Sequence, residues 1–159
     1  MNTSTSVSEV LRAFHYGLYV IGSRKDDLVS TIVANWVTQV SFTPPLISIA
    51  IETNSRIEEY IKASNVFSVN LLPGGAKDIA KAFIKPGIPR GRNINGREYV
   101  PAENGSPFLM DALACLSCNV VGTHGAGDHT LFIGEAVESV LHGPGDALTL
   151  KETGWQYRR

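Results

Sequence analysis

The first half of the chain alternates between runs of β-type residues and short polar segments. Residues 16–23 and 28–42 are rich in aromatic and β-branched side chains, and the polar segment 24–27 separates them. This pattern predicts a β-hairpin. Two prolines directly before residue 46 end the second run, and residues 46–52 and 66–72 then predict two further strands.

Three short helices are predicted between these strands. Ser6 is followed three residues later by Glu9, and Ser55 by Glu58, which is the spacing of a capping box at a helix start. Residues 74–83 predict a third helix, which the chain enters through two glycines.

The second half of the chain predicts a long hairpin after a long connection. Residues 111–124 and 128–142 have the composition of two strands, and the glycine-rich turn 125–128 joins them. Residues 146–150 predict one more strand. Residues 85–107 are polar and contain glycine and proline, so we expect a long loop that is either functional or mobile.

The order of these elements indicates the fold class. Six or seven strands follow one another as hairpins, against only three short helices, whereas a doubly wound sheet needs a helix between most strands. We therefore predict a mainly β protein, an antiparallel β-barrel with short helices at its rim. A length of 159 residues is typical of a single domain, which we expect to cover residues 1–159.

Composition narrows the classes of partner. Apolar residues make up 43% of the chain and charged residues 18%, which is typical of a soluble globular protein with surface buried against another subunit. A net charge of -1 gives no basic surface for nucleic acid. No apolar run approaches the roughly 18 residues that span a bilayer, and no secretory signal is visible at the start. We therefore expect no membrane partner and a cytoplasmic location.

Both cysteines and two histidines gather in the segment 115–129. In a strand, residues three apart point to opposite faces, so Cys115 and Cys118 do not share a metal ion, and we predict no metal site. A redox dithiol requires a helix start that this segment lacks. We expect one cysteine in the core and the other facing outward. His129 follows a glycine turn that allows close approach of another group, or it is simply solvated or bonded to Asp128.

A phosphate site is compatible with the second predicted helix. The chain contains neither of the usual glycine-rich phosphate motifs. The backbone amides at a helix start, together with the hydroxyl of Ser55 and the guanidinium of Arg56, form a site that suits one phosphate. The alternative is that Ser55 only caps the helix and that Arg56 is solvated.

Several segments taken together resemble the flavin reductase-like family, the FMN-binding split barrels. They are "STIVANWVTQVSFTPPLISIAIETNSR", "FSVNLL", "DALACLSCNV" and "GDHTLFIGEAV", in this order. "SPFLMDALACLSCNVV" and "GWQY" are also similar to flavin reductase domains that are associated with flavodiiron proteins and rubredoxins. The resemblance implies an FMN-binding split β-barrel.

The same resemblance implies a set of site residues. The residues along the isoalloxazine ring are Thr31, Val33, Ala34 and Asn35. The residues toward the ribityl chain and phosphate are Ser41, Asn54, Ser55 and Arg56. His129, in the "GDH" motif, then flanks the nicotinamide side of the flavin. The aromatic residues that we interpret as core or interface rather than flavin contacts are Tyr16, Trp36, Phe83 and Trp155.

The function implied is an NAD(P)H-dependent flavin reductase, in which a hydride passes from NADH or NADPH to FMN or FAD. No metal or catalytic triad is expected, because the cofactors carry the chemistry. A homodimer and a redox protein partner are also implied. Two alternatives stay open: an FMN-containing electron-transfer module that accepts electrons from a rubredoxin or ferric-reductase type of partner without using nicotinamide, and a flavin-binding or nucleotide-binding protein without turnover. The basic loop 85–107, with Arg90, Arg92 and Arg97, covers the pocket or contacts a nicotinamide phosphate, or else it is simply solvated.

Overall fold

The structure is a computed structural model that describes residues 6–87 and 89–156. Its helices are α1 (Val7–Arg12), α2 (Arg56–Ser64), α3 (Lys77–Ala82) and α4 (Leu150–Thr153). Its strands are β1 (Tyr19–Lys25), β2 (Leu28–Ala34), β3 (Val37–Ser41), β4 (Leu46–Glu52), β5 (Val66–Leu71), β6 (Pro89–Arg90), β7 (Asn93–Ile94), β8 (Arg97–Pro101), β9 (Pro107–Leu109), β10 (Ala114–Ala126) and β11 (His129–Leu141).

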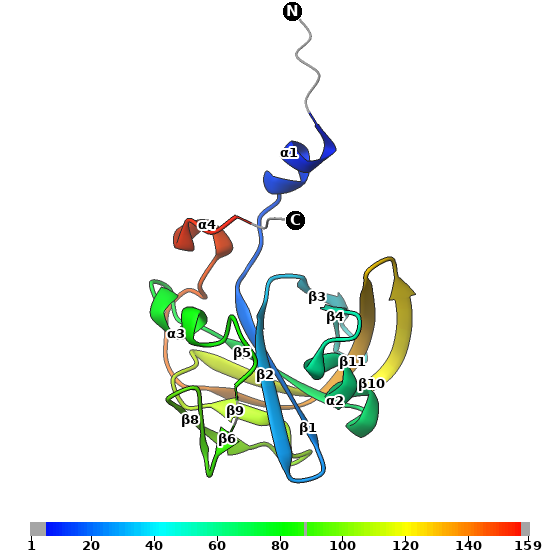
Figure 1. Cartoon of the computed structure of the whole chain (residues 1–159), viewed down its shortest axis with the longest axis vertical. Helices are drawn as coiled ribbons and strands as arrows, with labels where there is room; N and C mark the ends of the chain where they lie inside the picture. Colours follow the sequence, from blue (N-terminus) through cyan, green and yellow to red (C-terminus); the bar gives the residue numbers. More distant parts are fainter. Residues whose placement is uncertain (1–5, 88, 157–159) are drawn as a thin grey trace, which may run out of the picture.

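Seven strands form one antiparallel sheet in the order β2-β1-β5-β10-β11-β4-β3. The sheet curves into a barrel-like body, with α2 lying beside β1 and β2 while α1 and α4 stand together at one end (Figure 1). The predicted fold class, mainly β and antiparallel with short helices, is confirmed. Among the described residues, no helix is long and apolar enough to cross a membrane.

The predicted first hairpin is confirmed, but its second strand is broken. The run 28–42 divides into β2 and β3 at Asn35 and Trp36. β2 pairs with β1, and β3 pairs with β4 at the opposite edge of the sheet. The backbone carbonyl of Trp36 accepts a hydrogen bond from the amide of Ala50 at 3.0 Å. The chain therefore crosses between the two sheet edges at the break and leaves the side chains there facing the end of the barrel.

The helix starts follow the capping prediction to different degrees. At α1, Ser6 and Glu9 form both bonds of the capping box. At α2, the Ser55 hydroxyl accepts from the amide of Glu58, but the Glu58 carboxylate accepts from the amide of Asn54 instead of that of Ser55. The positive φ of Asn54 (64°) brings its amide to this position. Only half of the second predicted box is therefore formed.

Residues 85–107 are not the open loop that the sequence predicts. They contain three strands of a second, four-stranded sheet, in the order β6-β7-β8-β9. Buried Asn70 fastens this sheet to the barrel, because its Oδ1 accepts from the amide of Leu109 at 2.8 Å and its Nδ2 donates to the carbonyl of Pro107 at 3.2 Å. Short two-residue strands leave almost no alternating pattern in a sequence, which explains the wrong prediction.

The strand predicted for residues 146–150 is also wrong. Two isolated bridges, Gly17 with Thr149 and Pro73 with Ala147, take its place, and α4 begins at Leu150. Thr149 caps α4 with a complete capping box to Glu152. The β-type residues of this segment therefore serve to fasten the C-terminal segment to the barrel.

Both cysteines are fully buried, so the prediction that one faces outward is wrong. Cys115 packs in a core cluster with Phe83 and Phe108, whereas Cys118 packs in the other cluster with Phe67. The two side chains point to opposite sides of β10, as the strand period predicts, but both sides are covered. Burial raises the pKa of each thiol to about 12. The described residues contain no group of three or more histidine, cysteine or acidic side chains that could hold a metal ion.

Candidate functional site

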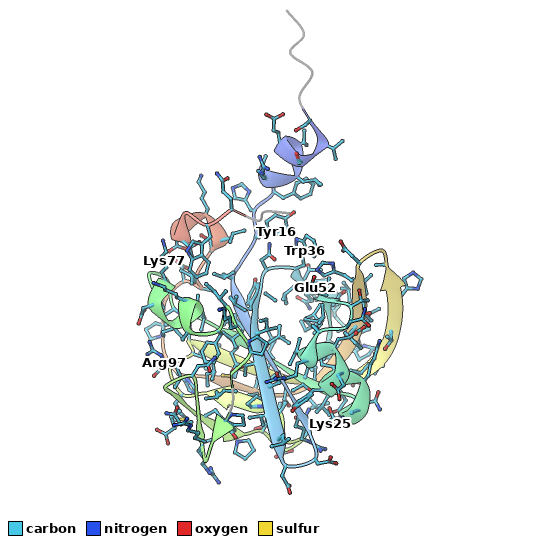
Figure 2. The ribbon with its side chains drawn as sticks, viewed as in Figure 1. Tyr16, Lys25, Trp36, Glu52, Lys77 and Arg97 are labelled. Carbon is cyan, nitrogen blue, oxygen red and sulfur yellow. The ribbon has the colours of Figure 1, made fainter. Side chains whose placement is uncertain are left out.

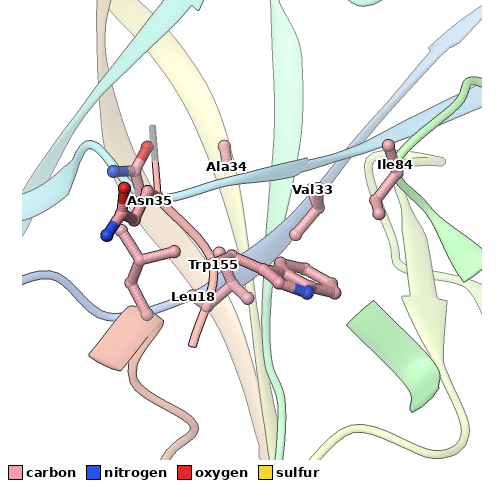
Figure 3. A pocket seen from close by; sticks show the side chains of 8 residues that line it. Leu18, Val33, Ala34, Asn35, Ile84 and Trp155 are labelled. Atoms are coloured by element: carbon pink, nitrogen blue, oxygen red, sulfur yellow. The ribbon is translucent and has the colours of Figure 1, made fainter. Parts of the chain in front are cut away.

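The break between β2 and β3 borders two adjoining cavities at one end of the barrel. The smaller cavity has a volume of about 260 Å³ and the larger about 770 Å³. The residues common to both linings are Asn35, Leu150, Trp155 and Gln156. The smaller cavity is otherwise lined by Leu18, Val33, Ala34 and Ile84, as Figure 3 shows. Volumes of this order suit a drug-sized or nucleotide-sized ligand.

Asn35 is the buried polar residue that lines both cavities. Its side chain is 4% exposed, and its Nδ2 atom has no hydrogen-bond partner among the described residues. A buried amide nitrogen without a partner costs about 1–3 kcal/mol. Since Asn35 borders both cavities, a carbonyl oxygen or ring nitrogen of a ligand is the natural acceptor for it.

Aromatic rings from separate segments surround the larger cavity. Phe14 and Tyr16 are stacked with centroids 6.2 Å apart and planes at 18°. Trp36 packs on His129, and Trp155 completes the lining. Tyr16 and Trp36 lie at the same end of the barrel in Figure 2. Flat apolar walls of this kind favour a planar ring system.

His129 is held in place by its neighbours. Its Nδ1 atom lies 2.5 Å from Oδ1 of Asp128. The backbone carbonyl of Asp128 accepts from the amide of Thr53 at 3.0 Å and from the Thr53 hydroxyl at 2.8 Å. His129 is 9% exposed and lines the larger cavity, so its remaining ring atoms are the ones that a ligand meets.

Gly127 supplies the backbone conformation of the turn before His129. Its φ is 63°, in the left-handed region that glycine adopts readily. A Cβ atom added there would meet nothing within 4 Å among the described residues. The space beside Gly127 is open among the described residues, so the close approach of another group stays a prediction.

The structure brings together some of the site residues that the sequence predicts. Val33, Ala34 and Asn35 line the smaller cavity, and Asn35 and His129 line the larger one. Thr31 is fully buried behind them, with its hydroxyl lacking a partner among the described residues. The predicted residues that line neither cavity are Thr31, Ser41, Asn54, Ser55 and Arg56.

The start of α2 lies next to the His129 turn, because Thr53 bonds Asp128. The Ser55 oxygen accepts from the Glu58 amide, as the capping alternative predicts, while Arg56 is exposed. Burial would raise the pKa of Glu58, but hydrogen bonds from Lys62, from the Thr130 hydroxyl and from a backbone amide hold it below its ordinary value. The first amides of the helix have no partner within it.

Sequence reasoning missed several lining residues. Tyr16, Trp36 and Trp155, interpreted as core or interface, line the larger cavity, whereas Phe83 is fully buried as expected. The sequence predicts Asp128 only as an alternative hydrogen-bond partner of His129. The two residues are adjacent in the chain, and this adjacency favours the contact. The arginines of residues 85–107 line neither cavity, and Arg97 pairs with Asp78 and Asp111, each at 3.0 Å.

Comparisons with known proteins agree with this geometry. The sequence matches a family model described as flavin reductase like domain over residues 11–156. It is 36% identical over 137 residues, 79% of this chain and 24% of the relative, to a Nostoc sp. (strain PCC 7120) protein described as diflavin flavoprotein A 3. It is 31% identical over 147 residues, 89% of this chain and 63% of the relative, to the high molecular weight rubredoxin of Moorella thermoacetica.

A solved structure shares the fold. The chain superimposes on the NADH:FAD oxidoreductase SgcE6 of Streptomyces globisporus C-1027 with a TM-score of 0.79 and 26% identity, covering 94% of this chain and 88% of that one. The predicted split-barrel fold of flavin reductases is thus confirmed. The chain spans about a quarter of the length of the diflavin flavoprotein and less than two thirds of the rubredoxin.

Proposed function

Because the chain belongs to the family of flavin reductase like domains, we propose that it binds FMN and catalyses hydride transfer to it from NADH or NADPH. FAD is the second flavin that we consider. The bound flavin supplies the hydride acceptor, and the protein supplies binding, orientation and exclusion of water. We further propose that residues 1–159 form a single domain of this type.

The observation that carries the proposal is the unpartnered Nδ2 atom of Asn35 at the border of the two cavities. A flavin ring is planar and has carbonyl oxygens and ring nitrogens along its edges. A buried donor on a residue that lines a largely apolar, aromatic-walled space suits such a ring. Val33 and Ala34, in the same segment, would present backbone and small side chains to it.

His129 is proposed to meet the nicotinamide. Asp128 occupies the Nδ1 side of the imidazole and Trp36 packs on the ring, so the orientation of the imidazole is fixed before a ligand arrives. An imidazole with a fixed orientation favours the close stacking of the nicotinamide on the flavin that hydride transfer requires. The description of the Streptomyces relative as an NADH:FAD oxidoreductase supports a nicotinamide donor.

The start of α2 is proposed to hold the flavin phosphate. Arg56 is exposed there, and the free amides of a helix start would donate to an anion bound beside it. Ser41, Asn54 and Ser55 would lie along the ribityl chain and phosphate. The link from Thr53 to Asp128 keeps this segment next to the His129 turn.

A second candidate function is an FMN electron-transfer module that accepts electrons from a redox protein. The observation in its favour is the 31% identity to a protein described as a high molecular weight rubredoxin, of which the chain covers 63%. In either case a rubredoxin-like partner is proposed for electron delivery.

A homodimer is also proposed. The described apolar residues with large exposure include Phe42 at 88%, next to the edge strand β3, and Val7 at 76% on α1. Exposed apolar surface of this kind is typical of a protein interface. A cytoplasmic location remains a prediction.

The experiment that tests the function starts with a visible spectrum of the purified chain before and after addition of FMN and FAD. Bound flavin gives yellow absorbance that stays with the protein on gel filtration, and a protein that stays colourless contradicts the proposal. NADH or NADPH is then added without oxygen. Bleaching supports the reductase, whereas yellow absorbance that persists in excess of both donors and bleaches with reduced rubredoxin supports the electron-transfer module.

A further inference from the structure

Basic side chains from two separate segments line the larger cavity. Arg12 extends from α1 and Lys151 from α4, and both are exposed. Neither forms an ion pair with another described residue. Asp128 is the one carboxylate among the described lining residues, and it lies against His129. The rim of this cavity therefore attracts an anion.

The topology keeps these two cations at the same end of the cavity. The amide of Leu150 donates to the carbonyl of Tyr16, and the amide of Leu18 donates to the carbonyl of Leu148, each at 2.9 Å. The pairing is antiparallel. The chain before residue 16 and the chain after residue 150 therefore leave the pair in the same direction, and Figure 1 shows α1 and α4 at the same end of the barrel, with α1 projecting beyond it.

The nearby carboxylates are occupied elsewhere. Glu9 accepts from the amide of Ser6 at 2.7 Å, and Glu152 accepts from the amide of Thr149 at 2.8 Å. Both carboxylates serve as helix caps, and neither lines the cavity. Hydrogen bonds from Ser6 and, to a lesser extent, the charge of Arg12 lower the pKa of Glu9, yet Glu9 does not line the cavity. Arg12 and Lys151 are therefore the two cations, beside the Asp128 carboxylate, that a ligand there meets.

We propose that Arg12 and Lys151 bind the diphosphate of the nicotinamide dinucleotide whose reactive ring lies against His129. The inference rests on the proposed reductase function and adds the group that recognises the donor. A diphosphate carries two negative charges, which match two cations that approach from different segments. The site is separate from the proposed flavin phosphate site at α2, whose Ser55 and Arg56 lie outside this lining.

The test compares two hydride donors with the flavin-loaded protein. NADH contains the diphosphate, whereas N-benzyl-1,4-dihydronicotinamide contains the reactive ring and no phosphate. In the double variant Arg12→Gln with Lys151→Gln, we expect the NADH concentration for half-maximal reduction to rise about tenfold, the order expected when two exposed charge contacts are lost. Reduction by the benzyl compound should stay unchanged.

A matched variant removes two exposed cations outside both cavities, Lys85→Gln with Arg92→Gln, and should behave as wild type with both donors. Raising the salt concentration should weaken NADH use by wild type more than by the cavity variant, because the charge contacts are screened.

The possible results separate the hypotheses. Unchanged NADH use by the cavity variant, or equal loss with both donors, overturns the diphosphate site. Weaker FMN binding by this variant with unchanged NADH use assigns the two cations to the flavin phosphate and also overturns it. If wild type is reduced by neither donor, the reductase function itself fails, whatever the variant does.

Discussion

The indole of Trp36 packs against the imidazole of His129, with ring centroids 4.7 Å apart and planes at 56°. Trp36 follows the break between β2 and β3, and His129 begins β11. Two segments more than 90 residues apart thus form one wall of the larger cavity. Tilted aromatic pairs of this kind contribute about 0.5–1.5 kcal/mol beyond the area that they bury.

Replacing Trp36 with Ala should slow reduction by NADH or NADPH about tenfold, because the His129 ring loses the surface that fixes its orientation. Trp36→Phe keeps an aromatic face and should restore most of the rate. Stopped-flow absorbance of the flavin-loaded protein measures both. A Phe variant as slow as the Ala variant would show that the indole has another task.

His129→Ala should slow reduction by nicotinamide at least tenfold while flavin affinity changes less than twofold. The imidazole is proposed to meet the nicotinamide and not the flavin, which is why the two measurements separate. The control is His124→Ala, since His124 is exposed on the β10–β11 hairpin and lines neither cavity. Equal loss of flavin binding and reduction would remove this role from His129.

The double variant Ser55→Ala with Arg56→Ala should weaken FMN binding about tenfold or more and riboflavin binding little, because riboflavin lacks the phosphate. Isothermal titration with the two flavins gives the comparison. Ser55 also caps α2, so Ser55→Ala costs about 1 kcal/mol of stability by itself. Arg56→Gln alone avoids that cost and should show the same preference. Identical weakening for both flavins would place the phosphate elsewhere.

Glu58→Gln should lower the free energy of unfolding at pH 7 by about 1–3 kcal/mol, because a buried carboxylate loses charged hydrogen bonds. The pKa of Glu58 is lower in the folded protein than its ordinary value of 4.5. Its contribution is therefore present above the unfolded pKa and lost as pH falls through the folded pKa.

Urea unfolding of this variant between pH 7 and pH 3 checks the sign, since the difference from wild type should shrink as the pH falls. Glu59→Gln is the matched control, because Glu59 pairs with Lys25 at the surface and exposed pairs contribute about 0–1 kcal/mol. A difference that stays constant down to pH 3 would contradict the role of the charge.

Cys115 and Cys118 should not react with a thiol reagent at pH 8 in the folded protein. Burial raises the pKa of both thiols to about 12, so almost no thiolate is present, and neither sulfur is accessible. Colour development with a chromogenic disulfide should report two thiols after unfolding in guanidinium and none before. Rapid labelling of the native protein would show that β10 opens readily.

The sequence by itself determined the longer strands, the long β10–β11 hairpin and the family. β-type residues and their alternation between apolar and polar positions place β4, β5 and the long β10–β11 hairpin correctly. Strands of this length contain enough positions for the alternation to be recognised. The bond from the Glu58 amide to Ser55 at the start of α2 is also predictable from the sequence, because it joins residues only three apart. The ordered motifs around Asn35 and His129 pointed to residues that do line the cavities.

Only the tertiary structure decided which residues meet. The break that separates β2 from β3 is set by pairing with strands at opposite sheet edges, which no local pattern contains. The burial of both cysteines, the attachment of the small sheet through Asn70, and the placement of Arg12 and Lys151 in the lining of one cavity likewise depend on how distant segments pack. Local propensity describes what each segment can form, whereas packing of distant segments selects which face is covered and which lines a cavity.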